Sequence, residues 1–246
     1  MNQTCRDIEV IVVDDGSAIH KERIKPYMDR IHYITKANGG TASALNHGIR
    51  LAAGTYVAWL SSDDMFYPTK VERQLAFMEQ QNAAISYTDY HVINESSQVT
   101  ESCATVKFPT ARALIEAFAS YCPVNGSTVM MRKDFVHNIG YFDESLPFTH
   151  DYEFWLRTLL HRVDFYYINE PLTAYRKHKQ MGTVRHIAAI QTEFETVKKA
   201  CLPQLRKLLK KTLIIMSIVQ YWRGRNVSQY HHINFQQLEN DGTMPE

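Results

Sequence analysis

Short apolar runs alternate with amphipathic stretches through the first part of the chain. The run Ile8–Val13 is rich in β-branched residues and predicts a strand that is buried on both faces. Further strands are predicted at 31–35, 56–60 and 84–87, and helices at 20–29, 41–53 and 68–80. This alternation predicts an α/β fold built from consecutive βα units, with a mostly parallel sheet flanked by helices.

The remaining pattern is less regular. Residues 91–110 are polar and predict an exposed loop or a short hairpin. Beyond them, helices are predicted at 111–120, 133–139 and 151–161, and strands at 126–131 and 164–168. Because the pattern is helical from Ile187 onward, we predict a domain over 1–185, a helical extension over 186–229 and a polar, partly disordered tail over 230–246.

The apolar run Leu213–Trp222 is the longest near the C-terminus. Ser217 and Gln220 interrupt it, and it is shorter than the roughly 20 residues that cross a bilayer. Lysines and arginines flank it on both sides. Two interpretations stay open: an amphipathic helix that packs on the domain or on a partner subunit, as in a homodimer, or peripheral contact with the inner face of the membrane.

The composition is that of a folded domain with a sizeable core. Of the 246 residues, 45% are hydrophobic and 11% aromatic, which excludes an intrinsically disordered chain. The formal net charge of +1 gives no general attraction for polyanions, so no nucleic-acid partner is expected. The four cysteines lack metal-ligand spacing and the N-terminus lacks the features of a signal peptide, so we expect a cytoplasmic protein.

Two acidic pairs stand just after predicted strands. Asp14 and Asp15 follow the first strand, and Asp63 and Asp64 follow the strand at 56–60. Ligands of open α/β sheets bind beyond the carboxyl ends of the strands, so these carboxylates are candidate ligand contacts. The second pair offers hard oxygen ligands for Mg²⁺ or Mn²⁺. The alternative for each pair is a turn in which an aspartate caps the next helix.

A glycine pair follows the strand at 31–35. Gly39 and Gly40 allow a phosphate or a base to approach the backbone closely, Lys36 supplies positive charge, and Asn38 lies between them in the sequence. The N-terminus of the next helix adds a dipole that favours an anion. The alternative is a plain turn.

Three motifs, taken in order, resemble glycosyltransferase family 2. They are Asp14-Asp15-Gly16-Ser17, Asn38-Gly39-Gly40-Thr41-Ala42 and Ser62-Asp63-Asp64. The resemblance covers about residues 1–180 and implies the GT-A fold, a Rossmann-like nucleotide-diphospho-sugar transferase fold.

The resemblance also implies roles for the motif residues. Asp14 would contact the nucleotide base, Asp63 the ribose, and Asp64 the divalent metal that bridges the diphosphate. The remaining members of the expected nucleotide-sugar-binding set are Asp15, Lys36, Asn38 and Gly40.

A later acidic motif resembles the part of the family that carries the catalytic base. Asp151 would be that base, and His150 stands where the family usually has glutamate. Without the other motifs, we would interpret Asp151 as the N-cap of its helix. His178, in Tyr175-Arg176-Lys177-His178, is the candidate second metal ligand, with an exposed basic loop as the alternative, and Asn125–Thr128 resembles a wall of the acceptor site.

The family's first strand and helix have no counterpart in this sequence. The chain begins at what resembles the end of that helix, near Asn2-Gln3-Thr4. Since the strand is ordinarily central in the sheet, its loss is expected to leave unpaired backbone groups on its two neighbours.

By resemblance, the chain is a metal-dependent, inverting glycosyltransferase of polysaccharide biosynthesis. It would use Mg²⁺ or Mn²⁺ and move a sugar from a nucleotide diphosphate, with a UDP-sugar favoured, to a hydroxyl of a saccharide or lipid-linked acceptor. No Gln-x-x-Arg-Trp follows Asp151, so single addition is expected rather than processive synthesis. Two alternatives stay open: an inactive, truncated remnant that binds a sugar nucleotide or a partner, and a nucleotidyltransferase, which needs a Gly-rich loop with Arg or Lys that this sequence does not show.

Overall fold

A computed structural model of the chain describes residues 2–19, 21–219 and 231–232. The polar tail predicted at 230–246 lies outside these residues, apart from His231 and His232. The same holds for the end of the apolar run, beyond Val219. None of the described helices combines the length and the apolar character needed to span a bilayer.

The described elements alternate along the chain as an α/β protein. The strands are β1 (Ile11–Asp14), β2 (His32–Thr35), β3 (Tyr56–Val57), β4 (Met65–Phe66), β5 (Ile85–Ile93), β6 (Val99–Glu101), β7 (Met130–Arg132), β8 (Phe165–Arg176) and β9 (His231–His232). The α-helices are α1 (Gly40–Leu51), α2 (Lys70–Gln81), α3 (Ala111–Phe118), α4 (Lys133–Ile139), α5 (His150–Leu160), α6 (Gly182–Arg185) and α7 (Ile187–Val219), and two 3₁₀ helices span Lys21–Tyr27 and Gly126–Thr128.

The described strands form two sheets. β1 and β2 pair with each other, while the larger sheet has the order β3-β7-β5-β8-β4, with β6 paired to β5 and β9 to β8. The pairings β1–β2 and β5–β8 are parallel, and the shorter pairings of β3, β4, β6, β7 and β9 are antiparallel. The α/β class is therefore confirmed, and the sheet is more mixed than the alternation predicted.

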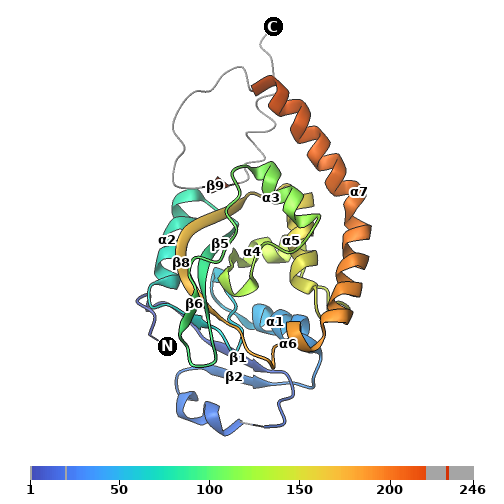
Figure 1. Cartoon of the computed structure of the whole chain (residues 1–246). Helices are drawn as coiled ribbons and strands as arrows, with labels where there is room; N and C mark the ends of the chain where they lie inside the picture. The colour runs from blue at the N-terminus through green and yellow to red at the C-terminus, as the bar shows by residue number, and fades with distance from the viewer. Residues whose placement is uncertain (1, 20, 220–230, 233–246) are drawn as a thin grey trace.

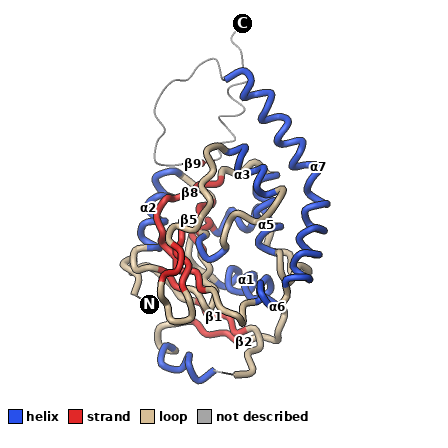
Figure 2. Tube along the Cα trace, in the orientation of Figure 1, coloured by secondary structure: helices blue, strands red, loops and turns tan. Residues whose placement is uncertain are grey.

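Helices cover the larger sheet on both sides. α2 lies on one side, and α3, α4 and α5 lie on the other (Figures 1 and 2). The smaller apolar cluster joins α2 to the sheet through Phe77, Met78 and Ile168. The larger cluster includes Trp155 and Phe154 of α5, both fully buried. Long aromatic side chains on α5 thus fix this helix against the sheet, and with it the residues of its first turn.

The prediction that the first strand is buried on both faces is wrong. Ile11, Val12 and Val13 are only partly buried, and Ile8 precedes the strand with 38% of its surface exposed. Among the described strands, β1 pairs with β2 alone and β3 with β7 alone. The described strands are thus divided between two sheets, and β1 lies in the smaller one.

Several element boundaries differ from those predicted, for local reasons. The segment at 20–29 forms a 3₁₀ helix because Pro26 lacks the backbone N–H that an α-helix needs. Residues 126–128 form a 3₁₀ turn instead of a strand, because the Asn125 side chain accepts a hydrogen bond from the Ser127 N–H at 3.0 Å. The polar region after residue 91 continues β5 and then turns into β6, which confirms the hairpin alternative.

Gly126 lies directly against the ring of Trp59. A Cβ at position 126 would come within 1.8 Å of the Trp59 Cζ2 atom. Trp59 cannot retreat easily, because its ring stacks on Trp155 at 5.9 Å and meets Phe142 edge to face at 5.3 Å. Only glycine fits this position without moving the aromatic core.

We expect Gly126→Ala to lower the free energy of unfolding by about 2 kcal/mol, because overpacking forces the rings to shift. Urea denaturation followed by fluorescence measures this change. The matched control is Gly182→Ala, since nothing lies within 4 Å of a Cβ at that helical position. An equal response of both variants would show that the contact with Trp59 carries no strain.

Candidate active site

The end of β1 holds the first acidic pair. Asp14 is 8% exposed, and its carboxylate accepts hydrogen bonds from the Ser17 N–H at 2.7 Å and from the Tyr33 hydroxyl of β2. The hydrogen bond to this carboxylate raises the pKa of Tyr33. Asp14 is thus fixed by the turn that follows its own strand and by the neighbouring parallel strand.

Asp15 organises the glycine loop before α1. Its carboxylate accepts hydrogen bonds from Lys36 Nζ at 2.6 Å, the Gly39 N–H at 2.9 Å and the Gly40 N–H at 2.7 Å. Asn38 Nδ2 donates to the Asp15 carbonyl at 2.8 Å. Burial works to raise the pKa of Asp15, but these hydrogen bonds and the Lys36 charge outweigh it and lower the pKa.

The structure therefore brings together Asp15, Lys36, Asn38 and Gly40. It also places a carboxylate where the sequence suggested a phosphate. The N–H groups at the start of α1 and the Lys36 ammonium already hold Asp15. In this arrangement, the hydrogen bonds of Asp15 fix the conformation of the loop.

Asp63 and His178 come together from segments far apart in the sequence. His178 Nε2 lies 3.0 Å from Asp63 Oδ2, and the two side chains are 20% and 36% exposed respectively. A pocket of about 680 Å³ opens beside His178 and is also lined by Tyr175, Lys177 and Lys179. Ligand pockets of proteins typically have 300–1,000 Å³, so this one has room for a small molecule next to the pair.

Asp64 points into the protein rather than toward His178. It is 7% exposed, and its two carboxylate oxygens accept hydrogen bonds from Ser127 Oγ at 2.6 Å and from the Arg176 N–H at 2.9 Å. Burial raises the pKa of Asp64, against the lowering effect of these two hydrogen bonds. Asp64 thus ties the second acidic motif to the 3₁₀ turn at 126–128 and to the end of β8.

Arg176 and Ser127 are site residues to which the sequence assigned no specific contact. Arg176 Nε donates to the Asp63 carbonyl at 2.8 Å, and its Nη1 donates to the Asn94 carbonyl at 2.8 Å. These bonds connect the acidic loop, the β5–β6 turn and the segment that carries His178. The sequence signals were present in Tyr175-Arg176-Lys177-His178 and in Asn125–Thr128, but a pattern of residue types does not show which atoms meet.

Asp151 lies in the first turn of α5 and is half-buried. The N-cap of this helix is Thr149, so the alternative in which Asp151 caps the helix is wrong. Burial raises the pKa of Asp151, while the charge of His150 and the Tyr152 N–H, which donates to it at 2.7 Å, work to lower it. A raised pKa makes a carboxylate a stronger proton acceptor.

His150 begins α5 and is 7% exposed. Its ring meets Phe142 edge to face at 5.9 Å, and its Nδ1 atom has no hydrogen-bond partner among the described residues. His150, which stands where the family usually has glutamate, is therefore buried next to Asp151.

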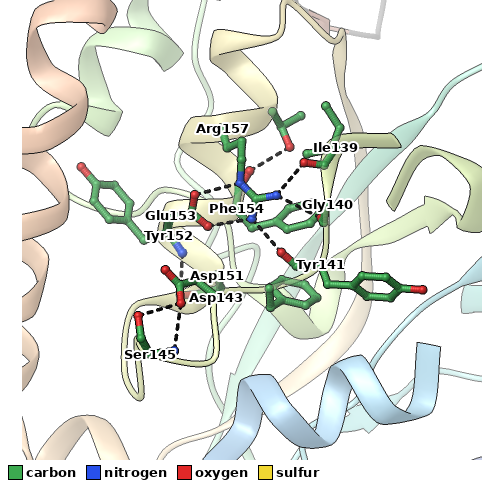
Figure 3. A network of polar contacts seen from close by, with 12 residues as sticks. Ile139, Gly140, Tyr141, Asp143, Ser145, Asp151, Tyr152, Glu153, Phe154 and Arg157 are labelled. Atoms are coloured by element: carbon green, nitrogen blue, oxygen red, sulfur yellow. Dashed lines mark hydrogen bonds and ion pairs between the residues drawn. The ribbon is translucent and has the colours of Figure 1, made fainter. Parts of the chain in front are cut away.

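Arg157 holds the start of α5 in place. Its guanidinium donates to the carbonyls of Ile139, Gly140 and Tyr141 at 2.8–3.0 Å. Figure 3 shows Arg157 reaching from α5 back to this segment while it also binds Glu153 on its own helix. Such a fixed guanidinium positions the whole first turn, including Asp151, relative to the loop that precedes it.

One short segment connects the neighbourhoods of Asp151 and Asp64. The negative charge of Asp151 contributes to raising the pKa of Cys122, after the larger effect of burial, so these two groups are close. Five residues later, Ser127 donates to Asp64. Residues 122–127 therefore run from the candidate base to the second acidic pair.

The described residues contain no group of three or more His, Cys, Asp and Glu side chains that could hold a metal ion. Asp63 and His178 still offer one carboxylate oxygen and one imidazole nitrogen at 3.0 Å. Mg²⁺ is usually held by one or two carboxylates and completes its shell with phosphate oxygens and water, and Mn²⁺ also favours carboxylate and water oxygens. The residues present therefore fit a metal that binds together with a diphosphate.

Comparison with known proteins gives the chain its family. The family model described as "Glycosyl transferase family 2" matches residues 1–140. An uncharacterized glycosyltransferase of Rickettsia typhi is 34% identical over 229 residues, which cover 87% of this chain and 67% of the relative. The Escherichia coli protein named UDP-Glc:alpha-D-GlcNAc-diphosphoundecaprenol beta-1,3-glucosyltransferase WfaP is 30% identical over 185 residues, which cover 72% of this chain and 69% of that protein.

Solved structures show the same fold. TarS of Staphylococcus aureus, residues 1–349 in complex with UDP-GlcNAc, superposes with a TM-score of 0.60 at 18% identity. The match covers 93% of this chain, which spans 62% of the TarS chain. With the family model and these relatives in agreement, the chain belongs to glycosyl transferase family 2 and has its GT-A fold.

Proposed function

We propose that this glycosyltransferase is a metal-dependent, inverting enzyme that transfers a sugar from a UDP-sugar to a hydroxyl of a saccharide or lipid-linked acceptor. The observation that carries the proposal is the Asp63–His178 pair at the edge of a pocket with two lysines. A carboxylate and an imidazole suit a divalent cation, and the lysines suit the phosphates it would bridge.

The geometry favours Asp63 over Asp64 as the direct metal ligand. Asp63 Oδ2 lies beside His178, whereas both Asp64 oxygens accept hydrogen bonds from the protein. We assign Asp64 the task of positioning the acidic loop through Ser127 and Arg176. When bound, the cation would stabilise the charge that develops on the departing nucleoside diphosphate.

On the donor side, Asp14 is proposed to accept hydrogen bonds from the nucleotide base. It lies at the carboxyl end of β1, where nucleotides bind in open α/β sheets. Asp15, Lys36, Asn38 and Gly40 support this role by holding the adjoining loop through their mutual hydrogen bonds.

On the acceptor side, Asp151 is proposed as the general base. Its carboxylate takes the proton of the acceptor hydroxyl while that oxygen bonds to the anomeric carbon and the bond to the leaving diphosphate breaks. The raised pKa of Asp151 suits this task. Attack from the face opposite the leaving group inverts the anomeric configuration.

The names of two similar proteins support the choice of donor and acceptor. The WfaP name specifies UDP-Glc as donor and a sugar on diphosphoundecaprenol as acceptor. TarS has been solved with UDP and with UDP-GlcNAc. A uridine diphosphate donor and a lipid-linked saccharide acceptor are therefore the first to test.

We expect the chain to bind UDP in a Mn²⁺-dependent manner and to release UDP from a UDP-sugar when a matching acceptor is present. Asp63→Asn should weaken Mn²⁺-dependent UDP binding at least about 10-fold, because it removes the charged metal ligand. Calorimetry with UDP and Mn²⁺ measures the binding, and Asp29→Asn, at an exposed aspartate, is the matched control. If Asp63→Asn binds UDP with Mn²⁺ as the wild type does and Asp64→Asn loses this binding, Asp64 is the metal ligand instead.

A second candidate function is a binding protein without turnover. The divided sheet favours it, because β1 carries Asp14 and pairs, among the described strands, with β2 alone. Binding of UDP and Mn²⁺ without UDP release from any tested UDP-sugar would support this candidate. Release of UDP that depends on Asp151 would exclude it.

A further inference from the structure

The second half of α7 is strongly basic. From Thr196 to Val219 the helix contains six lysines and arginines and no aspartate or glutamate. The whole chain has a formal net charge of only +1, so the positive charge in this half of α7 is a local excess. Such a local excess of positive charge attracts an anionic partner.

Four of these cations, Lys199, Arg206, Lys207 and Lys210, lie on one face of the helix. The opposite face is apolar, and Val197, Leu205 and Leu208 on it are buried in the larger core cluster. The outward face carries a shallow groove of about 460 Å³, lined by Lys199, Leu202, Pro203, Arg206, Lys207 and Lys210. None of its four cations has an ion pair among the residues that the structure describes.

The position of α7 leaves this face accessible. The helix packs on α3 and α5, and its C-terminal end extends past both of them (Figure 1). After Lys211 the sequence turns from basic to apolar, beginning at Leu213. A basic face that leads into an apolar segment is typical of helices that lie in the plane of a membrane surface.

We propose that the cationic face of α7 formed by Lys199, Arg206, Lys207 and Lys210 binds the surface of an anionic phospholipid bilayer. Phospholipid headgroups complement its unpaired positive charges, and the aliphatic parts of Leu202 and Pro203 between them suit the headgroup boundary. A single-stranded nucleic acid fits less well, because such sites interleave cations with stacking aromatic rings and the groove has none. The proposal does not depend on the catalytic function.

Sedimentation with vesicles tests it. The protein should bind vesicles of equimolar phosphatidylglycerol and phosphatidylcholine at low salt, and bind vesicles of pure phosphatidylcholine far more weakly. The triple variant Arg206→Glu, Lys207→Glu, Lys210→Glu should bind the anionic vesicles at least about 100-fold more weakly, since each cation near such a surface contributes about five-fold. High salt should release the wild-type protein.

The matched control is the triple variant Arg23→Glu, Lys25→Glu, Lys107→Glu, which changes the net charge equally at exposed positions elsewhere. It should bind anionic vesicles much as the wild type does. Equal loss in both triple variants would reduce the effect to net charge and overturn the proposal. So would equal binding to both kinds of vesicle, absence of binding, or displacement from vesicles by polyuridylate through the same residues.

Discussion

Replacing Asp151 by asparagine is expected to lower kcat about 10³-fold while leaving the affinity for UDP close to that of the wild type. Asparagine keeps the size of the side chain but cannot take a proton from the acceptor, and general-base catalysis typically contributes 10²–10⁴-fold. Turnover of a UDP-sugar with saturating acceptor measures kcat, and calorimetry measures UDP binding. The split between the two separates a catalytic role from a structural one.

The pH dependence of the wild-type enzyme gives a second readout of the same residue. Asp151 must be ionised to accept a proton, and its burial raises its pKa. The rate should therefore fall on the acid side at a higher pH than an ordinary, exposed aspartate would cause. In Asp151→Asn this acid limb should disappear from the residual rate.

Asp143→Asn is the nearby control. Asp143 lies in the loop before α5 and accepts hydrogen bonds from the N–H and the hydroxyl of Ser145 (Figure 3). It should change kcat only a few-fold. If Asp151→Asn retains the wild-type kcat and the acid limb, Asp151 is not the base.

The elements that the sequence predicted well are those with uninterrupted periodicity. The helix at 133–139 was predicted with the bounds that α4 has, and α7 begins at Ile187 as expected. β8 was predicted to end at Ile168, yet it continues to Arg176 through Asn169, Glu170 and Pro171. Residues of that kind usually end strands, but parallel pairing with β5 carries β8 past them by a shift in register.

The candidate site shows the same limit. Motif order placed Asp63, Asp64 and His178 in one neighbourhood, and the structure brings their segments together. The motif order could not predict that His178 contacts Asp63, or that Asp64 points inward to Ser127 and the Arg176 backbone. The contacts of Asp64 with Ser127 and with Arg176 span 63 and 112 positions of the sequence, respectively. They depend on how the ends of separate elements pack.

Lys70→Met is expected to raise the free energy of unfolding by about 4 kcal/mol at pH 7. Lys70 begins α2, is fully buried, and has no hydrogen-bond partner for its Nζ atom among the described residues. Burial lowers its pKa from 10.5 to about 7, and each unit of such a shift corresponds to about 1.4 kcal/mol. Methionine has a similar length and no charge to desolvate, and its sulfur can contact the Phe66 ring that Nζ now faces at 4.2 Å.

The gain should depend on pH in a defined direction. The unfolded chain holds the Lys70 proton up to about pH 10.5, whereas the folded chain loses it above about pH 7. Between these values the unfolded state binds more protons, so the stability contributed by this site rises with pH. It is lowest below pH 7. The advantage of Lys70→Met should therefore be largest at or below pH 7 and nearly vanish by pH 10.5.

Denaturant unfolding of both proteins at several pH values measures this difference directly. Lys199→Met is the matched control, because Lys199 is an exposed lysine in α7, and its free energy of unfolding should change by less than about 0.5 kcal/mol. A constant difference between Lys70→Met and the wild type across this pH range would show that the ammonium is not desolvated in the folded state. A destabilised variant would mean that the Lys70 ammonium has a polar partner in solution, and that a charged group inside the fold beside Phe66 stabilises the protein.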